Sequence, residues 1–402
     1  MRKITLRDIE IGKPIVCDCF DKSGILLLKR GVIINNAKQL SALLERGLFA
    51  NAPATERTAK PTIAPPVKAS PFDSIDNCKN SIGGMIAAVR VSNDVRSMDR
   101  IVFESLKDSY RSALSLAKED KLKSFPERII NVSKGIQALC ELDADAALGI
   151  IHLDHDGRYT VIHPMHKAIL TELIAKRMSI TARERLSIIA AALTANISII
   201  DLQENLHKQD APLNPEQKEL MRMHPLLSVE MLLELGVQDD LWIKTVLYHH
   251  ERLDGNGYPC GIAGDNIPLS VRIISLADIY GAMIKHRSYR EAALAKDALR
   301  ELFMKRGADT DGELTQVFIK EMGLFPPGTF VKLQNSETAI VIKRGGSATT
   351  PLVKSVVGPR GAPLDRPLLR NTAESEFTIK EIAPRDKIVG INLRSLWGYD
   401  SH

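Results

Sequence analysis

A long stretch of helical periodicity constrains the fold of this chain more than any other feature. Between about residues 72 and 322, apolar side chains recur at spacings of three and four, which is the pattern of helices that bury one face. The clearest runs are Ile129–Leu142, Ala168–Met178, Leu226–Leu235 and Ala293–Phe303. We therefore predict a mainly α fold with a helical-bundle core.

The first 50 residues carry a different pattern. Apolar residues alternate as in short strands over Pro14–Cys17 and Gly24–Leu28. Between these two runs, Asp21–Gly24 has the residue types of a hairpin turn. A helix-like spacing follows at Asn36–Arg46. Together these features predict a small N-terminal α+β module.

Shifts in composition divide the rest of the chain. Residues 51–72 are rich in proline and poor in large apolar residues, which is typical of an extended linker. Near the C-terminus, the runs Gly328–Leu333 and Thr338–Ile342 flank a turn and have the character of strands. The predicted segments are the N-terminal module (1–50), a Pro-rich linker (51–72), a helical lead-in region (73–150), the main helical domain (151–322) and a small β-rich C-terminal appendage (323–402).

Charge and cysteine content narrow the classes of function. The chain of 402 residues has a formal net charge of +5 without a basic block, which is compatible with an anionic ligand and argues against DNA binding. Its five cysteines are dispersed, as expected of reduced thiols. The N-terminus lacks the apolar core of a signal peptide, and the longest apolar run, Leu186–Ile200, is too short to span a bilayer. We expect a cytoplasmic protein without a membrane partner.

Two adjacent histidines are the strongest chemical signal. His249 and His250 end a helical run that starts at Leu241, at a point where side chains from several directions can converge. Directly after them comes a glycine-rich loop closed by a proline. The residues of this loop motif are Asp254, Gly255, Gly257, Tyr258 and Pro259. An adjacent pair of imidazoles in this setting favours a metal site.

Three other residues are candidate ligands. His224 and His163 each precede a proline that we place at the start of a helix. Asp278 lies within an apolar helical run, where a carboxylate needs a partner or a metal. Imidazole and carboxylate together suit Fe, Mn, Zn or Ni. The alternatives are histidines that are simply buried in the core, and an ion pair of Asp278 with an arginine, for which Arg272, Arg287 and Arg290 are candidates.

Three further residues have two interpretations each. His166, three residues after His163, is either a substitute ligand or a surface residue. Glu251 and Asp254 either order the loop or are simply solvated.

The stretch from about residue 159 to 292, a third of the chain, resembles the HD-GYP family. The most specific match is the string from His249 to Pro259, HHExxDGxGYP, and weaker ones surround it. The other matching residues are Tyr159-Thr160, His163-Pro164, His224-Pro225, Ile267-Pro268, Arg272-Ile273, Asp278-Ile279-Tyr280, Arg287 and Tyr289-Arg290. HD-GYP proteins are HD-domain phosphohydrolases that hydrolyse cyclic di-GMP, so the resemblance implies an HD-domain-like helical bundle at residues 151–322.

The resemblance also implies a metal centre that cleaves a phosphodiester. One metal would be held by His224, His249 and His250, and a second by His163 and Asp278 together with the histidine of the HD dyad. The dyad aspartate would bridge both ions. The resemblance further assigns ligand-binding roles to Arg287 and Arg290, which would face the ligand phosphates, and to Tyr258.

The HD dyad itself is missing. Where the family has a phrase like A-A-L-L-H-D-I-G-K, this chain has A-A-L-T-A-N-I-S-I, so Ala195 and Asn196 stand at the dyad positions and Ile199 replaces the lysine. Alanine offers no ligand atom, and asparagine offers one neutral oxygen. We therefore identify no catalytic residue and expect one divalent transition metal (Fe, Mn, Zn or Ni) without a second.

Three functions remain open. The first is a degenerate HD-GYP protein that senses cyclic di-GMP or a related nucleotide, or that contacts signalling proteins such as diguanylate cyclases. The alternative is a metal-dependent phosphodiesterase with residual activity from the three-His site. A third is a structural role, in which the helical domain is a dimerising scaffold for the N-terminal module.

Overall fold

The computed structural model describes residues 98–118, 124–154, 157–209, 211–284, 294–306, 310–384 and 396–397, with the backbone of four short strands near the N-terminus. These strands are β1 (Arg2–Lys3), β2 (Cys19–Phe20), β3 (Leu26–Leu28) and β4 (Phe49–Ala50), in the sheet order β1-β4-β2-β3. Strands β2 and β3 pair antiparallel, and the predicted turn at 21–24 between them lies outside the described residues. The predicted strand at 14–17, helix at 36–46 and linker at 51–72 lie outside the described residues.

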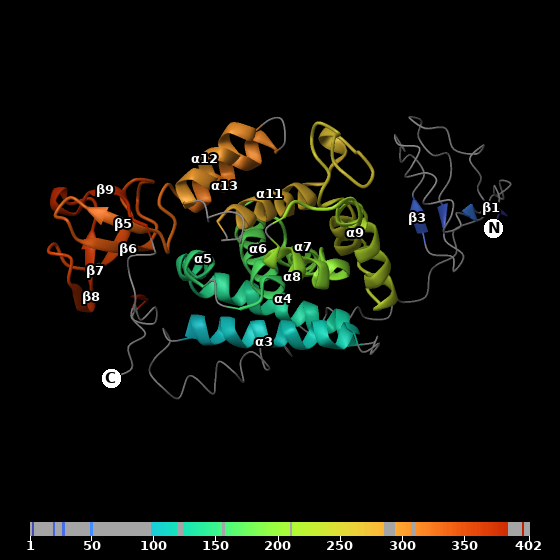
Figure 1. Cartoon of the computed structure of the whole chain (residues 1–402), viewed down its shortest axis with the longest axis horizontal. Helices are drawn as coiled ribbons and strands as arrows, with labels where there is room; N and C mark the ends of the chain where they lie inside the picture. Colours follow the sequence, from blue (N-terminus) through green and yellow to red (C-terminus); the bar gives the residue numbers. More distant parts are fainter. Residues whose placement is uncertain are drawn as a thin grey trace, which may run out of the picture.

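Helices make up the body of the protein, and helix α6 lies at its centre (Figure 1). Helix α6 packs against α7, α11 and α4, and every one of its residues from Tyr159 to Ala175 is buried. The helices are α3 (Met98–Lys118), α4 (Phe125–Leu142), α5 (Ala144–Leu153), α6 (Tyr159–Arg177), α7 (Ala182–Thr194), α8 (Ile200–Lys208), α9 (Pro215–Glu234), α10 (Asp240–Tyr248), α11 (Leu269–Met283), α12 (Ala295–Lys305) and α13 (Gly312–Met322), with short 3₁₀ turns η2 (Ile197–Ile199) and η3 (Gly264–Asn266).

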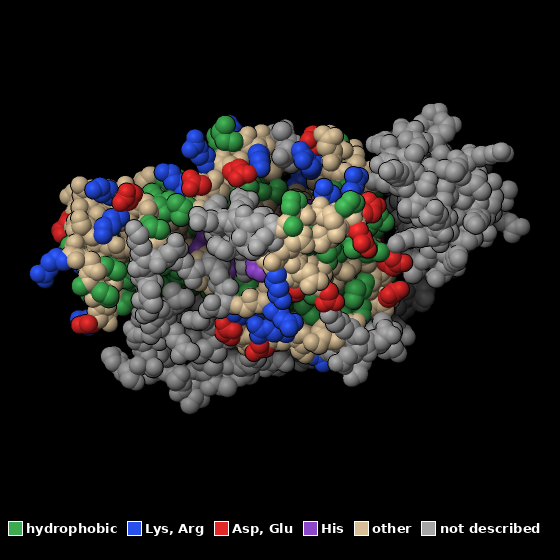
Figure 2. All heavy atoms as spheres, viewed as in Figure 1, with side chains coloured by type: hydrophobic (Ala, Val, Ile, Leu, Met, Phe, Trp, Pro, Cys, Tyr) green, Lys and Arg blue, Asp and Glu red, His purple; other side chains and the backbone are tan. Residues whose placement is uncertain are grey.

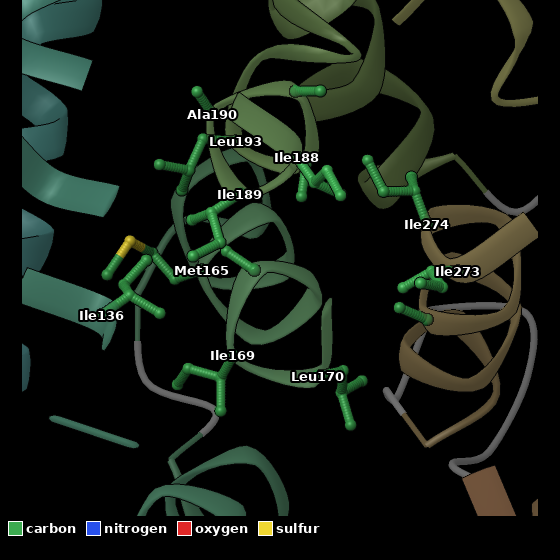
Figure 3. Close-up of a cluster of buried hydrophobic side chains, with 14 of the residues drawn as sticks. Ile136, Met165, Ile169, Leu170, Ile188, Ile189, Ala190, Leu193, Ile273 and Ile274 are labelled. Atoms are coloured by element: carbon green, nitrogen blue, oxygen red, sulfur yellow. The ribbon is translucent and has the colours of Figure 1, made fainter. Parts of the chain in front are cut away.

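The core around α6 is aliphatic. Ile136 of α4, Ile169 of α6 and Ile189 of α7 point into one cluster, and Ile273 of α11 reaches it from the opposite side (Figure 3). Burying such side chains contributes about 1.5–3 kcal/mol each. From Tyr159 to Ala175 the helix has no solvent face, so any polar group on this part of it is necessarily buried, whereas Lys176 and Arg177 at its end are exposed.

One stretch, Ala182–Lys208, is long and apolar enough to meet the criteria for a membrane span. It runs through α7, η2 and α8, and 67% of its most apolar window is buried inside the protein. Burial of this kind is what the core helix of a helical bundle requires.

Both prolines that we placed at helix starts lie inside helices, so this prediction was wrong. Helix α6 begins at Tyr159, five residues before Pro164. Helix α9 begins at Pro215, where Asn214 and Gln217 form a reciprocal capping box. The cap and the N-terminal proline at 215 are the stronger start signals, and Pro225 is tolerated further along because the site uses the carbonyl that it leaves free.

The C-terminal region forms an antiparallel sheet, as predicted. Its strands are β5 (Phe330–Leu333), β6 (Thr338–Lys343), β7 (Leu352–Val357), β8 (Pro363–Asn371) and β9 (Ile379–Ile382), in the order β8-β7-β6-β5-β9, with the 3₁₀ turn η4 (Ser375–Phe377) before β9. Arg344, which follows β6, pairs with Asp145 of α5 and with Glu321 of α13. The mainly α fold with a small β-rich C-terminal appendage is confirmed.

Candidate metal centre

Three histidines, one from the interior of a helix and two from the end of another, converge. His224 lies inside α9, and His249 and His250 follow the last residue of α10. One ring nitrogen from each of the three lies within 4.8 Å of the other two. His224 Nε2 and His249 Nε2 are 3.1 Å apart, close to the spacing of two nitrogens that share one ion at about 2.1 Å each.

The protonation of the first two rings follows from their hydrogen bonds. His224 Nδ1 lies 2.7 Å from the Met221 carbonyl and His249 Nδ1 lies 2.6 Å from the Val246 carbonyl. A carbonyl oxygen only accepts, so both Nδ1 atoms carry the proton and donate. The two Nε2 atoms then face each other with lone pairs, which repel at 3.1 Å unless a cation lies between them. The residues present therefore fit one metal ion.

Pro225 contributes to this arrangement. In an uninterrupted helix, the amide of residue 225 would donate to the Met221 carbonyl four residues earlier. Proline has no N–H, so this carbonyl is free to accept the proton of His224 Nδ1. The His-Pro pair thus fixes the tautomer of a candidate ligand.

All three imidazoles are held neutral. Burial lowers the pKa of His224 to about 3 and that of His250 to about 4. Burial, and after it the neighbouring His250 and His224, holds the pKa of His249 well below its usual value. Neutral imidazole is the form that binds metals.

His163 and Asp278, the other two predicted ligands, lie together beside the histidine cluster. His163 Nε2 of α6 is 3.1 Å from Asp278 Oδ1 of α11. A neighbour that the sequence did not indicate, Lys167, places its Nζ 3.0 Å from the same oxygen. Burial alone would raise the pKa of Asp278, but Lys167 and His163 hold it well below its usual value. Of the three arginines considered as alternative partners of Asp278, Arg272 pairs with Asp311, and Arg287 and Arg290 lie outside the described residues. In the described part of the chain, the cation beside Asp278 is a lysine.

The dyad positions lie at the end of α7, next to the histidine cluster. Ala195 is fully buried and presents only a methyl group. Asn196 begins the turn into η2, and its Oδ1 is buried without a hydrogen-bond partner in the described part of the chain. Two residues on, Ser198 Oγ donates to the His224 carbonyl at 3.1 Å. The turn thus adjoins the site, but at the two dyad positions it supplies a single neutral oxygen, Asn196 Oδ1.

The loop after His250 folds back over the site. The Tyr258 ring stacks on the His250 ring at 4.8 Å, and the Tyr258 amide donates to the His250 carbonyl. Glu251 holds the loop closed by accepting the amide protons of Cys260 at 2.6 Å and Gly261 at 3.1 Å. Burial raises the pKa of Glu251 to about 7.

Three other loop residues, Gly257, Asp254 and Gly255, have conformations or contacts that explain why they occur in this loop. A Cβ at Gly257 would lie 2.4 Å from the Arg252 amide nitrogen and 2.5 Å from Glu251 Cα, so only glycine fits. Asp254 accepts from the Asn256 amide at 2.9 Å and pairs with Arg252. Gly255 has a positive φ of 75°. The loop-ordering interpretation of Glu251 and Asp254 therefore describes their contacts.

The remaining predicted residues fall elsewhere. Arg287 and Arg290 lie outside the described residues. His166 is 3% exposed and packs on Phe103 of α3, so its assignment to the surface was wrong. The ring of His163 stacks on a different aromatic residue, Tyr159, with ring centres 5.0 Å apart. Histidine side chains are visible near the middle of the face drawn in Figure 2.

Comparison with known proteins identifies the class. The HD domain family matches residues 155–314, which contain all five predicted ligands, so this segment is an HD domain. This segment carries the His-His-Glu and GYP motifs by which it resembles the HD-GYP family.

Two curated relatives show the extent of the likeness. The chain is 26% identical to a cyclic di-GMP phosphodiesterase of Pseudomonas aeruginosa over 63% of this chain and 60% of that protein. It is 30% identical to a 3'3'-cGAMP-specific phosphodiesterase of Vibrio cholerae over 51% of this chain and 45% of that protein. The chain thus spans only about half the length of these relatives.

A solved structure shares the fold. It is Bd1817 of Bdellovibrio bacteriovorus, described as an HDG"Y"P protein, with a TM-score of 0.50 and 14% identity, covering 79% of this chain and 98% of that one.

Proposed function

We propose that this chain is a cyclic-dinucleotide signalling protein that binds its ligand and does not hydrolyse it. The observation that carries the proposal is Ala195, a fully buried methyl group where the family has a metal-binding histidine. The relatives are named as cyclic di-GMP and 3'3'-cGAMP phosphodiesterases, which supports a ligand of this class. A bound metal would supply a positive charge for one ligand phosphate.

Calorimetry with cyclic di-GMP and with 3'3'-cGAMP on the metal-loaded chain tests the proposal. We expect binding without turnover. Hydrolysis at the rate of an intact HD-GYP enzyme, or no binding of either nucleotide at high micromolar concentration, would contradict it.

The second candidate is a phosphodiesterase with residual activity, and the facing Nε2 atoms of His224 and His249 favour it. A single ion can polarise a phosphoryl oxygen but lacks the partner that clamps the opposite oxygen. Turnover with Mn or Fe, compared with His249→Ala, decides this: activity that survives the substitution does not come from the three-His site.

The other features of the proposal rest on the sequence alone. We propose the ligand role for Arg287 and Arg290 and the segment boundaries 1–50, 51–72, 73–150, 151–322 and 323–402 on sequence grounds. A cytoplasmic location, a diguanylate cyclase or other signalling protein as partner, and a homodimer belong to the same proposal.

A further inference from the structure

A buried lysine lies where the family resemblance places the ligands of a second metal ion. Lys167 sits on α6, one helical turn after His163, so both side chains leave the same face of the helix. None of the Lys167 side chain is exposed. Its Nζ and His163 Nε2 approach one oxygen, Asp278 Oδ1, at 3.0 Å and 3.1 Å.

We propose that the Lys167 ammonium is a resident cation that takes the place of the second metal ion and limits the centre to one ion. The second set of ligands is already occupied by this arrangement, because Asp278 Oδ1 is shared by His163 Nε2 and the Lys167 ammonium. Ala195 removes the third ligand. The inference deepens the one-ion centre of the proposed function.

Charge repulsion supports the same conclusion. The Lys167 ammonium disfavours positive charge on His224, His249 and His250, so its field reaches the whole cluster. A dication placed beside an ammonium in a poorly solvated site is repelled strongly, since the interaction is screened far less than in water. One ion at the three-His cluster is compatible with the lysine, whereas a second at Asp278 would have to displace it.

The ammonium also has hydrogen-bonding capacity to spare. Apart from its ion pair with Asp278, Nζ has no well-oriented hydrogen bond to any residue that the structure describes. A buried ammonium has three donors, and a phosphate oxygen is a suitable acceptor for them. An anionic group that enters this part of the site would find in Lys167 a donor for one of its oxygens.

Metal titration of the full chain tests the inference without relying on activity. The chain is stripped with a chelator, titrated with Zn²⁺ or Co²⁺ by calorimetry, and analysed for metal content per chain. We expect one ion in the wild type. In Lys167→Met we expect the first ion to bind about tenfold more tightly or better, and a second, weaker ion to bind once Asp278 and His163 are released.

The matched control is Lys176→Met, which removes the same charge from an exposed position of the same helix and should behave as wild type. Lys167→Gln serves if Lys167→Met does not fold, as judged by circular dichroism. Two ions in the wild type, or one ion in both proteins with equal affinity, would overturn the inference. Nucleotide binding is measured in a separate experiment. A chain that binds one metal ion but no nucleotide would contradict the proposed function and leave the inference about Lys167 standing.

Discussion

At the scale of single residues, the site depends on polar groups that are buried in matched pairs. Asp278 was conspicuous in the sequence as a carboxylate within an apolar run. Its partner Lys167 was not, because nothing in the local pattern of α6 shows which residue of α11 will face it. Each of the two groups is stable in the interior only because the other is present.

A double-mutant cycle tests this pairing. Asp278→Asn leaves the fully buried Lys167 ammonium without a counter-charge, so we expect a loss of about 3–5 kcal/mol in the free energy of unfolding. Adding Lys167→Met should recover most of that loss, since the double variant contains no unpaired charge. Urea unfolding in the presence of a chelator measures both. If the two losses simply add, Lys167 and Asp278 do not stabilise each other.

At the scale of secondary-structure elements, the helices position the ligands through irregularities as much as through regular turns. His249 and His250 follow the end of α10, where backbone carbonyls are free. Inside α9, Pro225 frees the Met221 carbonyl for His224. Tyr258 then covers His250 from the loop.

Substituting Pro225 by alanine should separate stability from metal binding. The new amide would donate to the Met221 carbonyl and compete with His224 Nδ1. We expect the helix to become as stable or more stable, because an interior proline costs about 3 kcal/mol. The affinity for the first ion should fall about tenfold, as for the loss of other hydrogen bonds that orient ligands.

Thermal unfolding in chelator and a Zn²⁺ titration measure the two effects. Pro164→Ala is the control, because it restores an amide inside α6 without touching the three-His cluster. An unchanged metal affinity in Pro225→Ala would show that the Met221 carbonyl does not orient the ligand.

The sequence predicted the elements better than their starts. Helical spacing and the HHExxDGxGYP string were enough to indicate the bundle and to bring His224, His249 and His250 together. Proline was taken as a start signal because it is favoured in first turns, whereas the capping box at Asn214 and Gln217 sets the start of α9. Contacts between distant helices, such as that of α6 with α11, depend on packing that no local pattern records.

At the scale of the whole molecule, the C-terminal sheet is fastened to the helical body beside the site. Arg344, which follows β6, makes this attachment through Asp145 of α5. Further along α5, His152 links two helices of the body: its Nε2 lies 2.8 Å from the Tyr280 hydroxyl of α11 and its Nδ1 lies 2.9 Å from the Leu148 carbonyl. Burial lowers the pKa of His152 to about 4, although the backbone carbonyls of Leu148 and Pro327 oppose the shift. Tyr280 is itself only two residues from Asp278.

This histidine should make the protein sensitive to acid. A pKa lower in the folded chain than in the unfolded chain means that, between pH 6.5 and about 4, only the unfolded chain takes up the proton. Stability is therefore lost as the pH falls through this window, by about 2 kcal/mol at pH 5 from His152 alone. Urea unfolding at pH 7 and pH 5 should show a smaller loss for His152→Gln than for the wild type. An equal loss in both proteins would rule out His152 as a source of the acid sensitivity.

Two features separate this site from a dinuclear centre: the lost dyad at the end of α7 and the buried Lys167 on α6. Restoring hydrolysis should therefore require changes in both helices. Ala195→His with Asn196→Asp returns the dyad at the end of α7 but leaves Lys167 of α6 bound to Asp278. We therefore expect this double variant to hold one ion and to remain inactive on cyclic di-GMP. Adding Lys167→Met releases His163 and Asp278 as ligands, so the triple variant should hold two ions and hydrolyse the nucleotide.

Metal content and nucleotide turnover are measured on both variants, with circular dichroism to confirm folding because Ala195 is fully buried. A double variant as active as the triple variant would mean that a metal ion displaces Lys167 without help. If instead the triple variant binds two ions and stays inactive, the ligands of the metals suffice for the centre but not for the reaction. In that case hydrolysis needs a side chain that is not a metal ligand. The next residue to restore would be Ile199, which stands where the family has a lysine.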